Sequence, residues 1–299
     1  MTQDVAREWE LADVHVHLQD KRFGESLDDV AAVAARAAQK GVRRFVCAAT
    51  SPADWNRLAK IAKNLPDVYP CFGVHPWFCE SVQGDWIAPL KMFLDEFVAR
   101  DGLARPALGE VGLDFVVRNC DDAARKRQED VLSAQLDLAD ERALPVVLHS
   151  VRANDRVLDA MKERRNVPTW LLHGWNATAQ EIERAVELGA FFSFSRRNVS
   201  PNARRGRETI LAVPRDRILL ESDGPNPLPP DGYDNPDPNW QTKGVRMRDA
   251  SGALVDGPES VATTATRIAA LRGTAIDEFL AQTSLNERRF FSNWPMKKN

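Results

Sequence analysis

Histidine is rare in this chain, and two of its copies are spaced as a metal-binding pair. The 299 residues include only five histidines. His15 and His17 lie two residues apart in a short β-rich run, so both imidazoles point to the same side of a strand. Two convergent imidazoles are typical of a metal site, and a hydrogen-bonded polar pair that closes a strand is the alternative interpretation.

Further side chains of metal-binding types end other β-rich runs. They are Glu110, His149, His173 and Asp223. In a barrel, all parallel strands direct their carboxyl ends to one face, where such enzymes have their active sites. We therefore expect six metal-capable side chains to converge there. A set rich in imidazole favours a transition metal such as Zn or Mn, and Mg also remains compatible with it.

The elements that must position these side chains alternate between strand and helix. The β-rich runs cover residues 11–17, 42–48, 68–74, 106–110, 145–149, 169–173, 190–194 and 217–221. Helical patterns cover residues 27–40, 53–64, 123–143, 177–188, 259–271 and 275–282, the first of them opening with a Ser26/Asp29 capping box. This alternation predicts an α/β fold, a closed (β/α)8 barrel of the TIM type with the metal site at the C-terminal ends of the strands. A doubly wound open sheet is the alternative.

The composition changes abruptly over residues 224–258, where proline recurs without apolar periodicity. This segment is predicted to be a long loop. The helical patterns that follow are too short to form a core of their own, so we expect one barrel domain over residues 1–299, with C-terminal helices added to it.

Composition excludes several classes of protein. No window approaches the roughly 20 apolar residues of a membrane span, and a net charge of −3 argues against a polycationic nucleic-acid binder. The N-terminus shows neither an apolar leader nor a transit peptide, and the four cysteines form no CxxC pair. We therefore expect a cytoplasmic protein, and no obligate protein partner is evident.

The motifs, taken in chain order, resemble those of the TatD-like metal-dependent hydrolases. The matching elements are DVHVHL at 13–18, GVHP at 73–76, GEVGLD at 109–114, PVVLHS at 145–150, the histidine at 173, LLESDGP at 219–225 and TSLNERRFF at 283–291. The resemblance implies an amidohydrolase-type barrel with two metal ions. It assigns His15, His17 and Asp223 to one ion, His149 and His173 to the second, and Glu110 to a bridge between them. Many related barrels have a carboxylated lysine at that bridge, so Glu110 favours the nuclease-like branch.

Hydrolysis of a phosphodiester follows from this ligand set as a hypothesis. Two ions about 4 Å apart would activate a shared water, and Asp223 would accept its proton. We expect a 3′-to-5′ deoxyribonuclease that acts on nucleic-acid ends, or an enzyme for a small phosphoester. The alternatives are an acyl-bond hydrolase, acting on aminoacyl-tRNA or on a small amide or lactone, and a scaffold whose ligands are relics.

Candidate substrate contacts surround the predicted centre. The resemblance implies that His75 approaches the substrate phosphate, and a structural histidine in a turn is the alternative. Arginines gather after the seventh β-rich run, at positions 196, 197, 204, 205 and 207, and Arg196 and Arg197 are predicted to bind phosphate, although a solvated basic loop is the alternative. Arg152 is given the same role, one place later than the arginine of the family's His-Ser-Arg. Trp77, Trp175 and Trp240 are candidates for stacking on a base, or else anchors of their loops.

Overall fold

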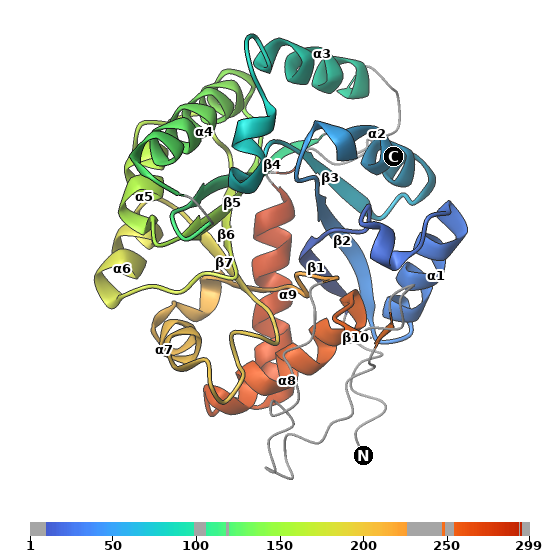
Figure 1. Ribbon diagram of the computed structural model, residues 1–299. Helices are drawn as coiled ribbons and strands as arrows, with labels where there is room; N and C mark the ends of the chain where they lie inside the picture. Colours follow the sequence, from blue (N-terminus) through green and yellow to red (C-terminus); the bar gives the residue numbers. More distant parts are fainter. Residues whose placement is uncertain are drawn as a thin grey trace.

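The architecture is a ring of eight parallel strands surrounded by helices (Figure 1). The computed structural model describes residues 10–98, 106–117, 120–225, 247–248, 254–292 and 294. The strands are β1 (Leu11–Val16), β2 (Val42–Ala48), β3 (Val68–Phe72), β4 (Ala107–Asp114), β5 (Val146–Val151), β6 (Trp170–His173), β7 (Phe191–Phe194) and β8 (Ile218–Leu220), and each is hydrogen-bonded to the next. The predicted α/β barrel of the TIM type is confirmed.

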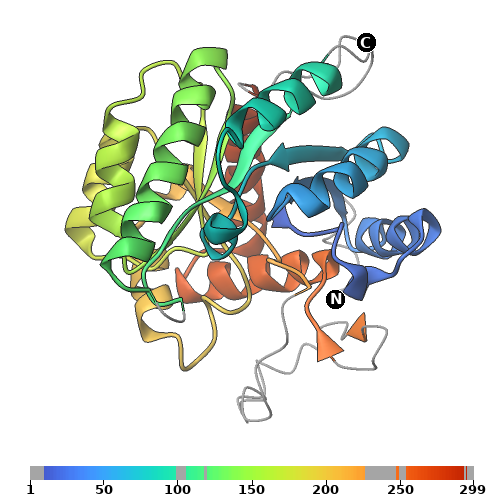
Figure 2. The ribbon, with the colours of Figure 1, turned by 45° about the horizontal axis from the view of Figure 1, so that its top comes forward.

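Helices alternate with the strands and cover the outside of the barrel (Figure 2), and the last helix, α9, follows α8 directly. They are α1 (Leu27–Ala38), α2 (Pro52–Asn64), α3 (Ile87–Val98), α4 (Asp122–Arg142), α5 (Asn154–Lys162), α6 (Ala179–Glu187), α7 (Arg204–Ala212), α8 (Val261–Leu271) and α9 (Ile276–Ser292). The predicted capping box is present, since Ser26 and Asp29 bond reciprocally at the start of α1. No described helix combines the length and apolar character that crossing a membrane requires.

Hydrogen bonds join the carboxyl end of β1 to the residues that directly follow β8. The Ser222 amide donates to Asp13 Oδ1 at 2.9 Å, and the Asp223 amide donates to the His15 carbonyl at 3.0 Å. The His17 amide in turn donates to the Gly224 carbonyl at 2.8 Å. These bonds close the barrel and fix the first and last candidate ligands of the chain side by side.

The C-terminal helix closes the opposite end of the barrel. Its aromatic residues Phe290 and Phe291, with Trp294 beyond it, pack among the inward-facing side chains of the strands, and α9 lies at the centre of the ring in Figure 1. Asn286 Nδ2 donates to the carbonyls of Arg215 and Ile218, each at 2.8 Å, just before and at the start of β8. The TSLNERRFF segment therefore seals the barrel, and the open end is the one that carries the candidate ligands.

Three helices and two element ends differ from the prediction. Helices α3, α5 and α7 lie where no helix was predicted. α5 and α7 have nine residues each, as the predicted α6 does, but unlike α6 they have no side-chain cap at their first turn. β4 continues beyond Glu110 to Asp114, and α9 continues to Ser292 rather than ending at 282. In the predicted loop 224–258, the described residues include a short antiparallel pair, β9 (Met247–Arg248) and β10 (Leu254–Val255). Most of that loop, with Trp240, lies outside the described residues.

Candidate metal centre

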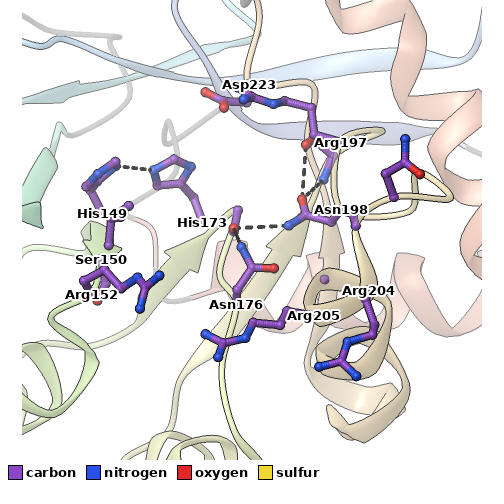
Figure 3. A pocket seen from close by; sticks show the side chains of 16 residues that line it. His149, Ser150, Arg152, His173, Asn176, Arg197, Asn198, Arg204, Arg205 and Asp223 are labelled. Atoms are coloured by element: carbon purple, nitrogen blue, oxygen red, sulfur yellow. Dashed lines mark hydrogen bonds between the residues drawn. The ribbon is translucent and has the colours of Figure 1, made fainter. Parts of the chain in front are cut away.

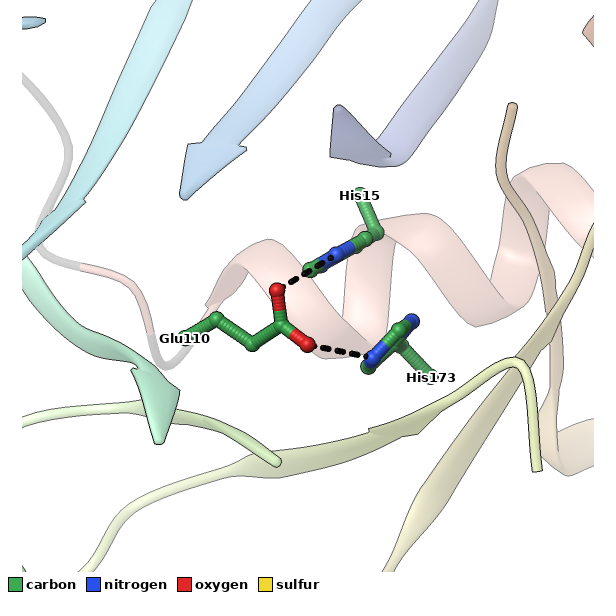
Figure 4. Close-up of side chains that lie close together, drawn as sticks. All are labelled: His15, Glu110 and His173. Carbon is green, nitrogen blue, oxygen red and sulfur yellow. Dashed lines mark ion pairs between the residues drawn. The ribbon is translucent and has the colours of Figure 1, made fainter. Parts of the chain in front are cut away.

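A buried carboxylate, that of Glu110, lies between two pairs of imidazoles at the carboxyl end of the barrel. Its Oε2 is 3.3 Å from His15 Nε2 and 3.5 Å from His17 Nε2. Its Oε1 is 2.8 Å from both His149 Nδ1 and His173 Nε2. Figure 4 shows the carboxylate between His15 and His173. Each oxygen thus faces a different set of histidines, as a bridging ligand would.

Asp223 joins the first of these pairs. Its Oδ1 lies 3.7 Å from Nε2 of both His15 and His17. The backbone of Asp223 has a φ of 55°, a left-handed conformation that costs a non-glycine residue on the order of 1–3 kcal/mol. The hydrogen bond that the Asp223 amide donates to the His15 carbonyl holds the residue in this conformation. Such strain is typical of functional sites, and here it directs the carboxylate at the two imidazoles.

His75, which was predicted to contact substrate, also contacts the Glu110 carboxylate. Its Nε2 is 3.2 Å from Glu110 Oε1, and the residue is buried. Its Nδ1 accepts a hydrogen bond from the Trp77 amide at 3.1 Å. Donor atoms of His75, Glu110 and His149 all lie within 4.8 Å of one another. The structure therefore brings His75 together with the six predicted ligands.

The electrostatics of the cluster keep its carboxylates ionised. Burial opposes ionisation of Glu110, but the neighbouring imidazoles, that of His75 first, outweigh burial and hold the pKa of Glu110 well below its usual range. Burial also raises the pKa of Asp223, but the nearby imidazoles of His17 and His173 outweigh this effect and lower the pKa to about 2. Conversely, Asp223 and Glu110 overcome the effect of burial on His17 and raise its pKa to about 9. The centre is therefore rich in ionised carboxylate.

The unmet hydrogen-bonding capacity of the cluster fits divalent metal ions. Within the described residues, both ring nitrogens of His15 and Nδ1 of His173 are buried without a hydrogen-bond partner. Buried polar atoms are normally paired, so these atoms need an explanation. His15, His17 and Asp223 form one set of donors within 4.8 Å, and His15, Glu110 and His173 form another. Imidazole and carboxylate donors of this kind suit a transition metal.

Asp114 contacts the ring nitrogen of His149 that faces away from Glu110, and the sequence analysis did not predict this contact. Its Oδ2 lies 3.4 Å from His149 Nε2 and accepts a bond from Trp77 Nε1 at 2.7 Å. Gln128 fixes the backbone of Asp114 by bonds of 2.8 and 2.9 Å. A metal-binding histidine commonly donates its second N–H to a carboxylate, so Asp114 is placed to orient His149. The available signal was spacing, because Asp114 lies four residues after Glu110 and so on the same side of the strand.

Glu221 stands in a similar relation to His173. It is fully buried, and its Oε2 lies 3.9 Å from His173 Nδ1 and accepts a hydrogen bond from the Ser193 hydroxyl. Its position two residues before Asp223 was the signal that sequence reasoning did not use. Asp114 and Glu221 each support one histidine of the pair that faces Glu110 Oε1.

A cavity of about 660 Å³ opens from the centre toward α7 (Figure 3). His149, His173 and Asp223 line one part of it, and the arginines that line it are Arg152, Arg197, Arg204 and Arg205. Arg196 is not among the lining residues. Its Nε lies 3.4 Å from Asp256 Oδ2, and both side chains are largely buried. The structure thus brings Arg152 and Arg197 to the cavity and pairs Arg196 with a carboxylate.

Two of the three tryptophans predicted to stack on a base or to anchor a loop lie among the described residues. Trp175 is buried, donates from Nε1 to Asn154 Oδ1 at 2.7 Å and stacks on Phe192, so it anchors its loop. Trp77 is 60% exposed and lies in a 3-10 helix, η3 (Pro76–Ser81), with its ring 5.0 Å from that of His75. Trp77 is therefore both anchored through Asp114 and available at the rim of the site.

Comparison with known proteins relates the chain to one family. Residues 12–292 match the family described as TatD related DNase. The uncharacterized metal-dependent hydrolase YjjV of Escherichia coli is 31% identical over 235 residues, which are 79% of this chain and 86% of YjjV. The 3′-5′ ssDNA/RNA exonuclease TatD of Erwinia tasmaniensis is 30% identical over 285 residues, 94% of this chain and 99% of that protein. The crystal structure of the E. coli TatD homologue YjjV matches with a TM-score of 0.78 at 28% identity, over 95% of this chain and 98% of that chain.

Proposed function

The chain belongs to the TatD-related DNase family and is a metal-dependent hydrolase, and on this basis we propose that it is a 3′-to-5′ exonuclease of single-stranded DNA. The observation that carries the proposal is the buried Glu110 carboxylate, which has two imidazoles at one oxygen and three at the other. A relative of nearly equal length is described as a 3′-5′ exonuclease of single-stranded DNA and RNA, which supports the substrate class.

The proposed centre would hold two divalent ions, Zn, Mn or Mg. His15, His17 and Asp223 would hold one ion, His149 and His173 the other, and Glu110 would bridge them. When bound, the ions supply Lewis-acid chemistry, because they acidify water and stabilise negative charge on the attacking and leaving oxygens.

The protein's own side chains orient the substrate and move the proton. Asp223 accepts the proton of the attacking water at its carboxylate and passes it to the leaving oxygen. The Nδ1 atom of His75 accepts a bond from the Trp77 amide, so a neutral His75 carries its proton on Nε2 and donates it toward Glu110 or a substrate phosphate oxygen. Arg197 and Arg152 supply planar guanidinium donors for the phosphate at the side of the centre.

We extend the proposal to the setting of the reaction. A single barrel domain would act in the cytoplasm on nucleic-acid ends, without a membrane or an obligate protein partner. The four cysteines support a reducing compartment, because all of them are free thiols.

Activity assays after separate reconstitution with Zn, Mn and Mg test the proposal. The substrates are single-stranded DNA labelled at its 5′ end, RNA, aminoacyl-tRNA and simple esters. We expect a ladder of DNA products that shorten one nucleotide at a time from the 3′ end. Hydrolysis of carbonyl substrates alone would instead show an acyl-bond hydrolase, and no hydrolysis with any metal would show a scaffold.

Asp223→Asn separates the chemical role from metal binding. We expect turnover to fall by at least about 10²-fold, as for the loss of a general base, while metal remains bound. The matched control is Asp216→Asn, a half-exposed aspartate at the other end of the barrel whose carboxylate pairs with Arg289. The control should retain turnover. Near-normal turnover of metal-loaded Asp223→Asn would contradict the assigned role.

A further inference from the structure

We propose that the cavity beside the metal centre is a subsite for a second phosphate, the one on the 5′ side of the phosphodiester that is cleaved. This inference rests on the proposed exonuclease function and specifies how the strand is held. The cavity is continuous with the centre, because His149, His173 and Asp223 line it. Its volume of about 660 Å³ is in the range of small-ligand sites and exceeds what a single phosphate needs.

Arginines from three separate segments converge on the cavity. Arg152 follows β5, Arg197 follows β7, and Arg204 and Arg205 begin α7. Figure 3 shows Arg152, Arg204 and Arg205 on the side of the cavity away from Asp223. Among the described residues, Arg204 has only an exposed partner, Glu208 at 3.8 Å, and no carboxylate pairs with the other three.

Several arginines on the outer layer pair with carboxylates, in contrast to those in the cavity. Examples are the pairs Arg142–Asp95, Arg164–Asp137, Arg184–Asp159 and Arg215–Glu278. Planar guanidinium groups bind phosphate oxygens with two parallel hydrogen bonds. The uncompensated charge in the cavity therefore fits an anion with several oxygens.

The start of α7 adds backbone donors to the same cavity. Ala203 precedes the helix without a side-chain cap, and Ala203, Arg204, Arg205 and Gly206 all line the cavity. The first N–H groups of a helix lack intrahelical partners and favour an anion. A Cβ atom at Gly206 would lie 2.6 Å from the Asn198 carbonyl oxygen, so only glycine lets α7 start this close to the loop after β7.

The turn that carries Arg152 is held in a strained conformation. Arg152 has a φ of 57° and follows the last residue of β5. Asn154 fixes the surrounding loops: its Oδ1 accepts from the Ser150 hydroxyl at 2.8 Å and from Trp175 Nε1 at 2.7 Å, and its Nδ2 donates to the Asn176 carbonyl at 3.1 Å. This bonding keeps Arg152 and Asn176 at the same cavity despite the left-handed backbone.

The two sides of the metal centre differ, and this difference sets the direction of the strand. Trp77, Phe78 and Val116, which follow β3 and β4, are exposed on the side away from α7. The 3′-terminal nucleotide has a base and no further phosphate, so it suits this apolar side. The upstream strand carries a phosphate at every step, so it suits the arginines.

Three dinucleotides test the subsite: d(NpN), d(pNpN) with a 5′-phosphate, and d(NpNp) with a 3′-phosphate. We expect kcat/KM of the metal-loaded protein to be about tenfold higher for d(pNpN) than for d(NpN), the scale of one charge-assisted contact. In the double variant Arg204→Gln/Arg205→Gln, this ratio should fall to about two or less. The salt dependence of kcat/KM for d(pNpN) should also become shallower, because fewer counterions are released.

The control removes the same kind of charge from the other end of the barrel. Arg215→Gln affects an exposed side chain that pairs with Glu278, and it should keep the wild-type ratio. A wild-type ratio near one, a preference for d(NpNp), or a ratio that survives in the double variant would each overturn the inference. Failure to cleave any of the three dinucleotides and single-stranded DNA with every metal would instead overturn the proposed function.

Discussion

A glutamate at the closed end of the barrel should make stability depend on pH. Glu287 is fully buried; its Oε1 accepts from the Ala12 amide at 3.0 Å, and its Oε2 accepts from Arg44 Nη2 at 2.8 Å. Burial outweighs the charge of Arg44 and raises the pKa of Glu287 to about 7, from an ordinary value of 4.5. Replacing Glu287 by Gln removes this titration and retains an oxygen for the Ala12 amide.

The magnitude follows from the difference between the folded and unfolded pKa values. A raised pKa means that the folded protein binds the proton more tightly than the unfolded chain. The stabilisation is therefore complete below about pH 4.5 and is lost as the pH rises through about 7. One pH unit inside this window corresponds to about 1.4 kcal/mol, so Glu287 should remove about 3 kcal/mol from the free energy of unfolding across it.

Urea unfolding of the metal-free protein at several pH values measures the effect. From pH 4.5 to 7.5, the unfolding free energy of the wild type should fall by about 3 kcal/mol more than that of Glu287→Gln, because only the wild type loses the contribution of protonated Glu287. Glu278→Gln, at an exposed position of the same helix, should show no such change. A constant difference between Glu287→Gln and wild type would instead show that Glu287 is ionised in the folded protein throughout this pH range and that its pKa is not raised.

Three further substitutions test other contacts of the structure. Asp114→Asn should weaken metal retention by about 10- to 100-fold in competition with a chelator, because His149 loses its orienting carboxylate; unchanged retention would show that Asp114 does not support the centre. Asn286→Ala should lower the free energy of unfolding in urea by about 1–3 kcal/mol, since the buried Ile218 carbonyl and the partly buried Arg215 carbonyl lose their donor; a loss below about 0.5 kcal/mol would contradict this. Ala143→Gly should stabilise the protein by about 0.5–1 kcal/mol in calorimetry, because Ala143 ends α4 with a φ of 49°; a lower Tm would show that the left-handed position carries no strain.

Much of the barrel could be predicted because strand and helix patterns are local. Each β-rich run is short, apolar and followed by a turn, and the resulting alternation defines the fold class. The contacts that close the barrel are not local. Asp13 reaches Ser222, and Ala12 reaches Glu287, across more than two hundred residues. Apolar periodicity carries no information about such pairs, although the resemblance in TSLNERRFF pointed to the segment that seals the barrel.

The candidate ligands were predictable for a geometric reason, and the surrounding residues were less so. Residues at the carboxyl ends of parallel strands share one face, whatever the loops do. Loop conformation decides the rest: Arg196 and Arg197 are neighbours in sequence, yet one pairs with Asp256 and the other lines the cavity. Arg152 reaches the same cavity only through a left-handed backbone, which its residue type does not suggest.

Crystallography of the Mn-loaded protein, with anomalous scattering measured for the metal, shows whether two ions share the Glu110 carboxylate. We expect two anomalous peaks, one on each side of this carboxylate, the first beside His15, His17 and Asp223 and the second beside His149 and His173. A single peak, or a pair of peaks that does not have Glu110 between them, would contradict the proposed two-ion centre.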